Sequence, residues 1–150
     1  MDPRTFLGRR KMRPLHVQVA RLDDHALRFD LPVGKGERAV ANVTPLRGEH
    51  VWGVAYEIEG RQASQLDRTE GVHVGAYLRR AIELRAKDGS RFGAFTYCSS
   101  RGVPGRKPSR RYMGLLLHGA RHHGLPDDYV TWLRSLELAP DERWGQRELF

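Results

Sequence analysis

The chain has 150 residues, of which 39% are hydrophobic and 29% charged, with a formal net charge of +8. These values fit one soluble globular domain with a real core. No apolar run reaches the ~18–20 residues that a membrane-spanning helix needs. The single cysteine, Cys98, excludes an intrachain disulfide framework and fits a reducing compartment, so we expect a cytoplasmic protein without a membrane partner.

The positive charge is spread along the chain, apart from two denser stretches at residues 9–13 and 101–111. A basic surface can bind nucleic acid through phosphate contacts. However, no nucleic-acid-binding motif accompanies the charge. We therefore expect no specific nucleic-acid binding, only weak and salt-sensitive association.

The first half of the chain reads mainly as strands. Asp2 and Pro3 suit the cap and first position of a short helix over residues 4–10. Alternating, Val-rich patterns follow, with turn residues between them. They predict strands at 15–22, 26–31, 39–43 and 50–58, with turns at Asp23-Asp24 and at residues 44–48.

The second half contains three helices and a hairpin. A short helix is expected over residues 60–68, and a hairpin over 76–86 and 91–97 around the turn dipeptide Asp88-Gly89. Ser109 caps a helix to about residue 122, which Gly124 ends, and a last helix covers 127–138. Strands before grouped helices indicate an α+β fold. We expect a single domain at 1–140 and a polar tail at 141–150.

One stretch, LDRTEGVHVGAY at residues 66–77, places the carboxylate of Glu70 between a helix end and a glycine-punctuated segment. Glycine permits tight bends, and a carboxylate at such a bend can project into a cleft. From spacing alone, a Glu beside a Gly at a helix end is typical of a solvated surface residue. The stretch therefore needs further support before it indicates chemistry.

That support comes from resemblance. LDRTEGVHVGAY resembles the signature of the gamma-glutamylcyclotransferase (AIG2-like) family, in which Leu-Asp-x-x-Glu-Gly-Val precedes Gly-x-Tyr. ARLDDHALRFD, GEHVWGVAYEI, TYCSS and PSRRYMGLLLHGARHHGLPDDYVTWL resemble other family segments in the family's order. The resemblance implies a small mixed β-barrel with helices packed around it.

It also implies an activity. In this family the α-amino group of a γ-glutamyl amine or amino acid attacks its own γ-carbonyl, giving 5-oxoproline and a free amine. No cofactor or metal is needed. Glu70 matches the general acid/base, and Tyr77 and Tyr112 match tyrosines that line the substrate pocket. By itself, a tyrosine on an apolar helix face is more typical of a core residue.

The resembled family has a strand and a Tyr-Gly-Ser-Asn turn before its first helix. Met1 lies where the residue after that Asn belongs, so we expect Met1 beside the substrate and an N-terminally truncated domain. The turn's backbone N–H groups would face the developing oxyanion. If that turn is absent, the chain is expected to be inactive.

Two alternatives remain at this stage. The chain could be a catalytically inactive family member that acts as a binding module, or an enzyme whose leaving amine differs, such as a polyamine or a lysine side chain. His118 and His122 have the i, i+4 spacing of metal ligands, but no HExxH motif accompanies them. We expect no metal site. The sequence does not predict the oligomeric state.

Overall fold

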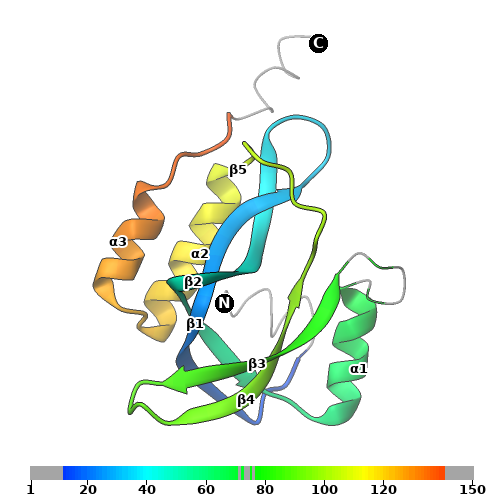
Figure 1. The fold of residues 1–150 in the computed structure, drawn as a ribbon, viewed down its shortest axis with the longest axis vertical. Coiled ribbons are helices and arrows are strands. Elements are labelled where there is room, and N and C mark those ends of the chain that lie inside the picture. Colours follow the sequence, from blue (N-terminus) through cyan, green and yellow to red (C-terminus); the bar gives the residue numbers. More distant parts are fainter. Residues whose placement is uncertain (1–11, 71, 73–74, 76, 141–150) are drawn as a thin grey trace.

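The computed structural model describes residues 12–70, 72, 75 and 77–140. Their elements, in chain order, are β1 (His16–Pro32), β2 (Arg38–Glu57), α1 (Gly60–Thr69), β3 (Leu78–Ala86), β4 (Arg91–Cys98), β5 (Lys107–Pro108), α2 (Arg110–His123) and α3 (Asp127–Ser135). Five strands form one sheet in the order β4-β3-β1-β2-β5, flanked by helices (Figure 1). The predicted α+β class is confirmed.

The sheet is mixed but open. β2 pairs with β5 in parallel, whereas the other neighbouring strands are antiparallel. The outer strands β4 and β5 do not pair with each other within the described residues. A closed barrel needs its last strand to pair along the first, and β5 has only two residues, at the beginning of β2. The expected barrel is thus an open, strongly bent sheet.

The four strands predicted before residue 60 are two long strands. β1 and β2 pair from His16↔Glu57 to Pro32↔Ala39, and the two predicted turns lie opposite each other within this hairpin. There the register shifts between Asp23 and His25, and the Gly48 N–H donates to Asp24 Oδ1 at 2.9 Å. The prediction of separate strands was wrong because the predicted turn residues form a local irregularity in both strands. The pairing of β1 with β2 continues on its far side.

The main apolar core lies where α2 and α3, side by side in Figure 1, cover β1 and β2. Its buried members are Val19, Met113, Ala120, Leu125, Tyr129, Val130 and Leu133. The helices turn apolar faces inward at 3–4-residue spacing, as amphipathic helices do. The burial of apolar side chains in such a core is the main favourable contribution to the stability of a domain.

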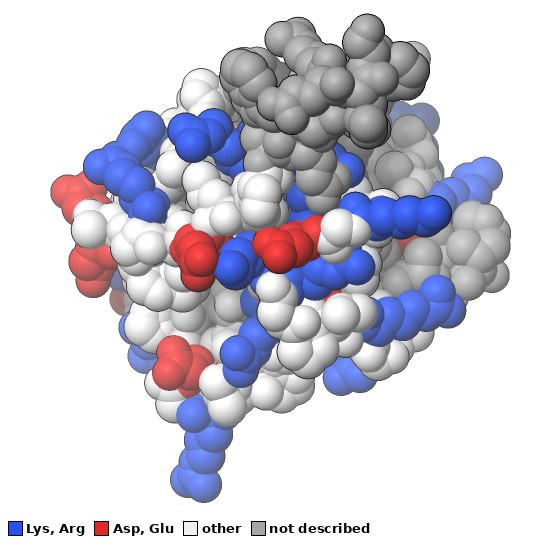
Figure 2. Space-filling view, turned by 90° about the horizontal axis from the view of Figure 1, so that it is seen from above, with Lys and Arg blue, Asp and Glu red and all other residues white. Residues whose placement is uncertain are grey.

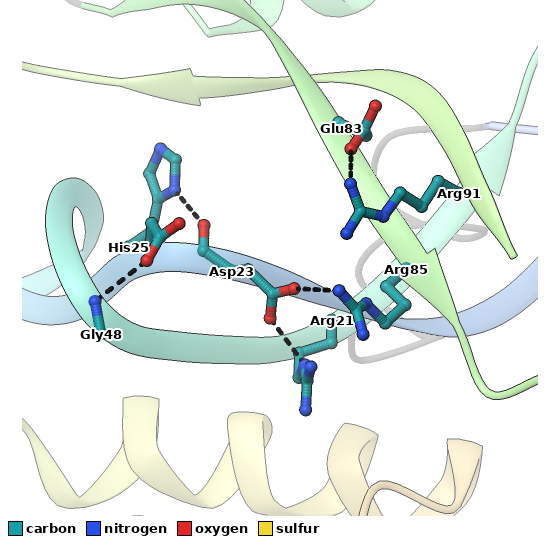
Figure 3. Close-up of polar contacts among 8 residues, drawn as sticks. Arg21, Asp23, His25, Gly48, Glu83, Arg85 and Arg91 are labelled. Carbon is teal, nitrogen blue, oxygen red and sulfur yellow. Dashed lines mark hydrogen bonds and ion pairs between the residues drawn. The ribbon is translucent and has the colours of Figure 1, made fainter. Parts of the chain in front are cut away.

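The β3–β4 hairpin joins the sheet differently. β3 pairs with β1 at only two positions, Ala20↔Ala86 and Arg21↔Arg85. Beside them, Asp23 lies between two guanidinium groups: its Oδ1 is 2.7 Å from Arg21 Nε, and its Oδ2 is 3.3 Å from Arg85 Nη2 (Figure 3). This charged clamp is partly exposed, so it supplements the short ladder only modestly.

The helix ends follow local sequence signals. The Ser109 hydroxyl accepts a hydrogen bond from the Tyr112 N–H at 3.1 Å, and Gly124 ends α2 with a φ of 73°. α3 ends at Ser135, three residues before the predicted end. Leu136, directly after it, has an extended backbone, and the Ala139 N–H donates to the Pro108 carbonyl at 2.9 Å. The helix expected at 4–10 and the tail at 141–150 lie outside the described residues.

On one face of the molecule, surface charge is distributed rather than gathered. On the face seen in Figure 2, Lys and Arg side chains lie at several separate places, with Asp and Glu side chains between some of them. In the described part of the chain, no helix has the length and apolar character needed to cross a membrane. Cys98 is buried at the end of β4. The expectation about nucleic acid stays a prediction.

Candidate active site

Glu70 is the residue that caps the C-terminal end of α1. Its backbone is helical, with φ −81° and ψ −3°, and its N–H donates to the Leu66 carbonyl at 2.9 Å. The side chain is half-buried. Leu66, one turn earlier, is buried, so Glu70 continues the helix face that points into the protein. The sequence correctly predicted this position at the end of the helix, and the role of Glu70 as general acid/base stays a prediction.

A polar lock fixes this end of α1 to the β3–β4 hairpin. The Tyr97 hydroxyl donates to Asp67 Oδ1, and Arg79 Nη1 lies 3.1 Å from Asp67 Oδ2. The Arg79 guanidinium lies 3.9 Å above the centre of the Phe95 ring. Because Arg79 and Tyr97 are paired across the hairpin, both reach the same carboxylate. Asp67 lies three residues before Glu70, so the lock also positions Glu70.

The polar lock shifts the pKa values of Tyr97 and Asp67 in opposite directions. Burial raises the pKa of Tyr97 above its ordinary range, and the hydrogen bond to Asp67 and the Asp67 charge add to this, with a further upward contribution from Glu70. The same Tyr97 hydrogen bond lowers the pKa of Asp67. The contribution of Glu70 is the smallest of these effects on the pKa of Tyr97.

Tyr97 also lines a cavity of about 510 Å³ between β1, β2, the β3–β4 hairpin and α1. Leu66 contributes to the same wall, and the other aromatic members are Tyr56, Phe92 and Phe95. A cavity with apolar walls and a few polar side chains is the usual form of a small-molecule site. The cavity therefore adjoins the turn of α1 that leads to Glu70.

Tyr112 approaches from α2, on the other side of the long hairpin. Its hydroxyl accepts a hydrogen bond from the Ala41 N–H at 3.0 Å, and its ring meets Phe29 edge-on, with centroids 6.3 Å apart. This bond holds the hydroxyl against β2. Tyr77 is half-buried and directly precedes β3. The substrate-binding roles of both tyrosines remain predictions, and Met1 lies outside the described residues.

A buried amide joins these two sides. Asn42, 2% exposed, donates from Nδ2 to the Ser99 carbonyl at 2.9 Å and accepts from the Ser99 N–H at 3.1 Å. Asn42 follows Ala41, which binds Tyr112, and Ser99 lies two residues beyond Tyr97. The end of β4 is thereby fixed to β2. Tyr112 nevertheless lines a separate cavity of about 240 Å³, which shares no lining residue with the cavity at Tyr97.

Sequence reasoning missed Tyr97, Asp67 and Asn42. The first two are 30 residues apart, and Asn42 is 57 residues from Ser99. The only available signal was the hairpin register, which places Tyr97 opposite Arg79. Nothing in the local pattern pairs α1 with that hairpin.

The described residues contain no group of three or more His, Cys, Asp or Glu side chains placed to hold a metal ion. The ring centres of His118 and His122 are 6.3 Å apart, and those of His122 and His123 are 4.8 Å apart. Tyr56 Oη lies 3.3 Å from His123 Nε2, so this cluster contacts β2 rather than Glu70.

Comparison with known proteins now gives the class. Residues 50–133 match the model of the AIG2-like family, a span that includes Glu70, Tyr97 and Tyr112. A gamma-glutamylcyclotransferase from Mus musculus is 32% identical over 132 residues, covering 85% of this chain and 69% of the relative. One from Bos taurus is 32% identical over 125 residues, covering 79% and 65%.

A solved gamma-glutamyl cyclotransferase structure superimposes with a TM-score of 0.75 at 26% identity, covering 81% of this chain and 73% of that one. This chain therefore belongs to the AIG2-like family of gamma-glutamylcyclotransferase-like proteins. It spans about two thirds of the length of the curated relatives from cattle and mouse.

Proposed function

We propose that this protein converts a γ-glutamyl amine or amino acid into 5-oxoproline and the free amine, with Glu70 as general acid/base. The observation that carries the proposal is the placement of Glu70. It ends α1 one turn after Leu66, which lines an aromatic-walled cavity together with Tyr97. The names of the similar proteins, gamma-glutamylcyclotransferase, support the same reaction.

The chemistry requires little more than proton transfer and positioning. Glu70 takes a proton from the substrate's α-ammonium group, and the freed nitrogen bonds to the γ-carbonyl carbon. The bond from that carbon to the leaving nitrogen then breaks as Glu70 returns the proton to this nitrogen. The ring nitrogen loses its second proton, and the released amine takes up a proton to leave as an ammonium ion. Because nucleophile and carbonyl belong to one molecule, holding the substrate folded supplies much of the rate. One carboxylate can perform both transfers.

Other residues would shape the pocket. We propose that Tyr77 and Tyr112 line the γ-glutamyl side, with the Tyr112 hydroxyl held by Ala41. The lock of Asp67, Arg79 and Tyr97 keeps the last turn of α1 in place. Glu70 can then face the reacting nitrogen without reordering a helix end.

The test measures 5-oxoproline release by mass spectrometry from a panel of γ-glutamyl amino acids and amines. Glu70→Gln is expected to lower turnover by ~10²–10⁴, the usual contribution of a general base. Glu59→Gln is the matched control, since Glu59 caps the other end of the same helix and pairs with exposed Arg61. Near-normal turnover by the Glu70→Gln variant would refute the assignment.

The expected Tyr-Gly-Ser-Asn turn is tested in the same assay. A form extended by any in-frame codons preceding Met1 is compared with residues 1–150. If only the extended form is active, the proposal stands and the turn is required. If residues 1–150 release 5-oxoproline at an ordinary enzymatic rate, the turn is dispensable.

A further inference from the structure

A basic hollow of about 670 Å³ lies against the exposed side of α1. Its lining residues are all polar, with three arginines and no carboxylate among them: Arg13, Arg61, Gln62, Gln65, Arg68 and Thr69. It shares no lining residue with the cavity at Tyr97. Helix α1 itself lies apart from α2 and α3 in Figure 1. The hollow is thus a second concave surface, separate from the proposed active site.

The spacing of the helix residues explains this side of α1. Arg61, Gln65 and Arg68 follow one another at intervals of four and three residues, which places them on one face of a helix. Leu66 is buried on the opposite face, and Glu70 lies one turn further along that face. A ligand in the hollow would therefore bind on the side of α1 that faces away from the proposed general acid/base.

Arg13 reaches the hollow from the segment before β1 and is held there by α1. With its amide oxygen toward the Arg13 N–H and its amide nitrogen toward the Arg13 carbonyl, the Gln62 side chain accepts from the first and donates to the second, both at 3.2 Å. Arg13 belongs to the basic stretch at residues 9–13, which the proposed function does not use. These two bonds fix the Arg13 backbone beside the arginines of the helix.

Nearby carboxylates leave most of this positive charge uncompensated. Among the described residues, neither Arg13 nor Arg68 forms an ion pair. Arg61 pairs with Glu59, Nε to Oε2, at 2.8 Å. Asp67, the acidic neighbour of Arg68, belongs to the polar lock instead. The C-terminal end of α1 carries a partial negative charge of about half a unit, which three guanidinium groups outweigh. The hollow therefore attracts anions.

We infer that this hollow is a binding site for a phosphate monoester group. Guanidinium groups bind phosphate oxygens through paired hydrogen bonds, and several of them together suit a group with two negative charges and three terminal oxygens. The Gln65 side-chain amide adds neutral N–H donors to the same wall. The inference goes beyond the proposed function and does not rest on it, because the two sites share no residue.

The test maps ligand binding on the wild-type chain through its backbone amide NMR signals, at a pH of about 8, where a phosphate monoester is a dianion. Ethyl phosphate is the probe. Diethyl phosphate, a singly charged diester, and succinate, a dianion without phosphate, are the control ligands. Ethyl phosphate is expected to shift the signals of residues 61–69 and not those of Phe92 and Gly93 in the other cavity. It should bind at least about fivefold more tightly than either control.

Substitutions then test the arginines themselves. Arg13→Gln and Arg68→Gln are each expected to weaken the binding of ethyl phosphate at least about fivefold. Arg134→Gln is the matched control, because Arg134 is an exposed arginine in the last turn of α3 and its loss lowers the net charge equally, away from the hollow. This control should bind ethyl phosphate like the wild type. In phosphate-free buffer, none of the three variants should change the rate of 5-oxoproline release.

Signal shifts at Phe92 and Gly93 in place of α1, or equal affinity for either control ligand, would overturn the inference. Undiminished binding by Arg13→Gln and Arg68→Gln would also overturn it, as would an equal loss in Arg134→Gln, which would indicate attraction to net charge alone. The wild-type map decides the question even if a substitution prevents folding. A lack of 5-oxoproline release would refute only the proposed function, since the NMR comparison does not depend on turnover.

Discussion

The long β1–β2 hairpin with α2 and α3 is held together by different forces from the β3–β4 hairpin with α1. The first region contains the main apolar core. In the second, the first four residues of β3 are exposed, and the links to neighbours are largely polar: Asp67 with Tyr97 and Arg79, and Asp23 with Arg21 and Arg85.

By this comparison, the first region mainly stabilises the fold, and the second carries the proposed catalytic residue. Apolar burial in the first region supplies most of the favourable free energy of folding, while the second contains Tyr97, which lines the cavity, and Glu70, the proposed general acid/base. Segments with few buried apolar contacts open more easily than the core, and binding regions are often drawn from them. Variants in the two regions should therefore have distinct signatures.

The largest effect on stability is expected in the core. Leu133 is 1% exposed, and Leu133→Ala leaves a cavity there, which should lower the free energy of unfolding by about 2–5 kcal/mol. Urea denaturation followed by circular dichroism measures this. Trp132→Ala is the adjacent control, because Trp132 is 40% exposed and should cost less. Equal losses in both variants would contradict the two-region description.

A smaller effect is expected at the lock. Tyr97→Phe removes the hydrogen bond to Asp67 and should lower the free energy of unfolding by about 0.5–1.5 kcal/mol. It should also lower kcat severalfold through the position of Glu70. The double variant Asp67→Asn/Tyr97→Phe should lose less unfolding free energy than the sum of the losses of the two single variants, since both changes remove the same interaction.

The lock also has a pH signature. The folded state raises the pKa of Tyr97, so folding favours the neutral phenol over the phenolate. The stabilisation of the folded state by the neutral phenol is therefore fully present below the ordinary tyrosine pKa of about 10. It is lost as the pH rises beyond that value. Denaturation of the wild type and Tyr97→Phe should therefore converge at alkaline pH. A constant difference up to the highest workable pH would contradict the lock.

The smallest effect is expected at the charged clamp. Asp23→Asn weakens two partly exposed ion pairs and should lower the free energy of unfolding by at most about 1 kcal/mol. The loss should shrink in high salt, where exposed charges are screened. Hydrogen exchange should report faster opening of β3 than of β1. A loss as large as that of Leu133→Ala would show that the clamp, not the core, dominates stability.

Local signals in the chain determined much of the outcome. Helix α2 begins after Ser109 and ends before Gly124, as predicted, because capping depends on a few neighbouring residues. Asp88-Gly89 lies in the turn between β3 and β4 for the same kind of reason: Gly89 takes a φ of 87°. The position of Glu70 at the end of α1 also follows from its neighbours.

Only the tertiary structure decided how these parts meet. It joined four predicted strands into two, and it paired Asp67 with Tyr97 and Asn42 with Ser99. It also left the Asp30 carboxylate oxygen buried beside Gly102. The physical reason is that periodicity and capping report interactions within a few residues. These contacts join residues much farther apart, 24 positions for Asp24 with Gly48 and 57 for Asn42 with Ser99, and depend on how the strands of a bent sheet meet.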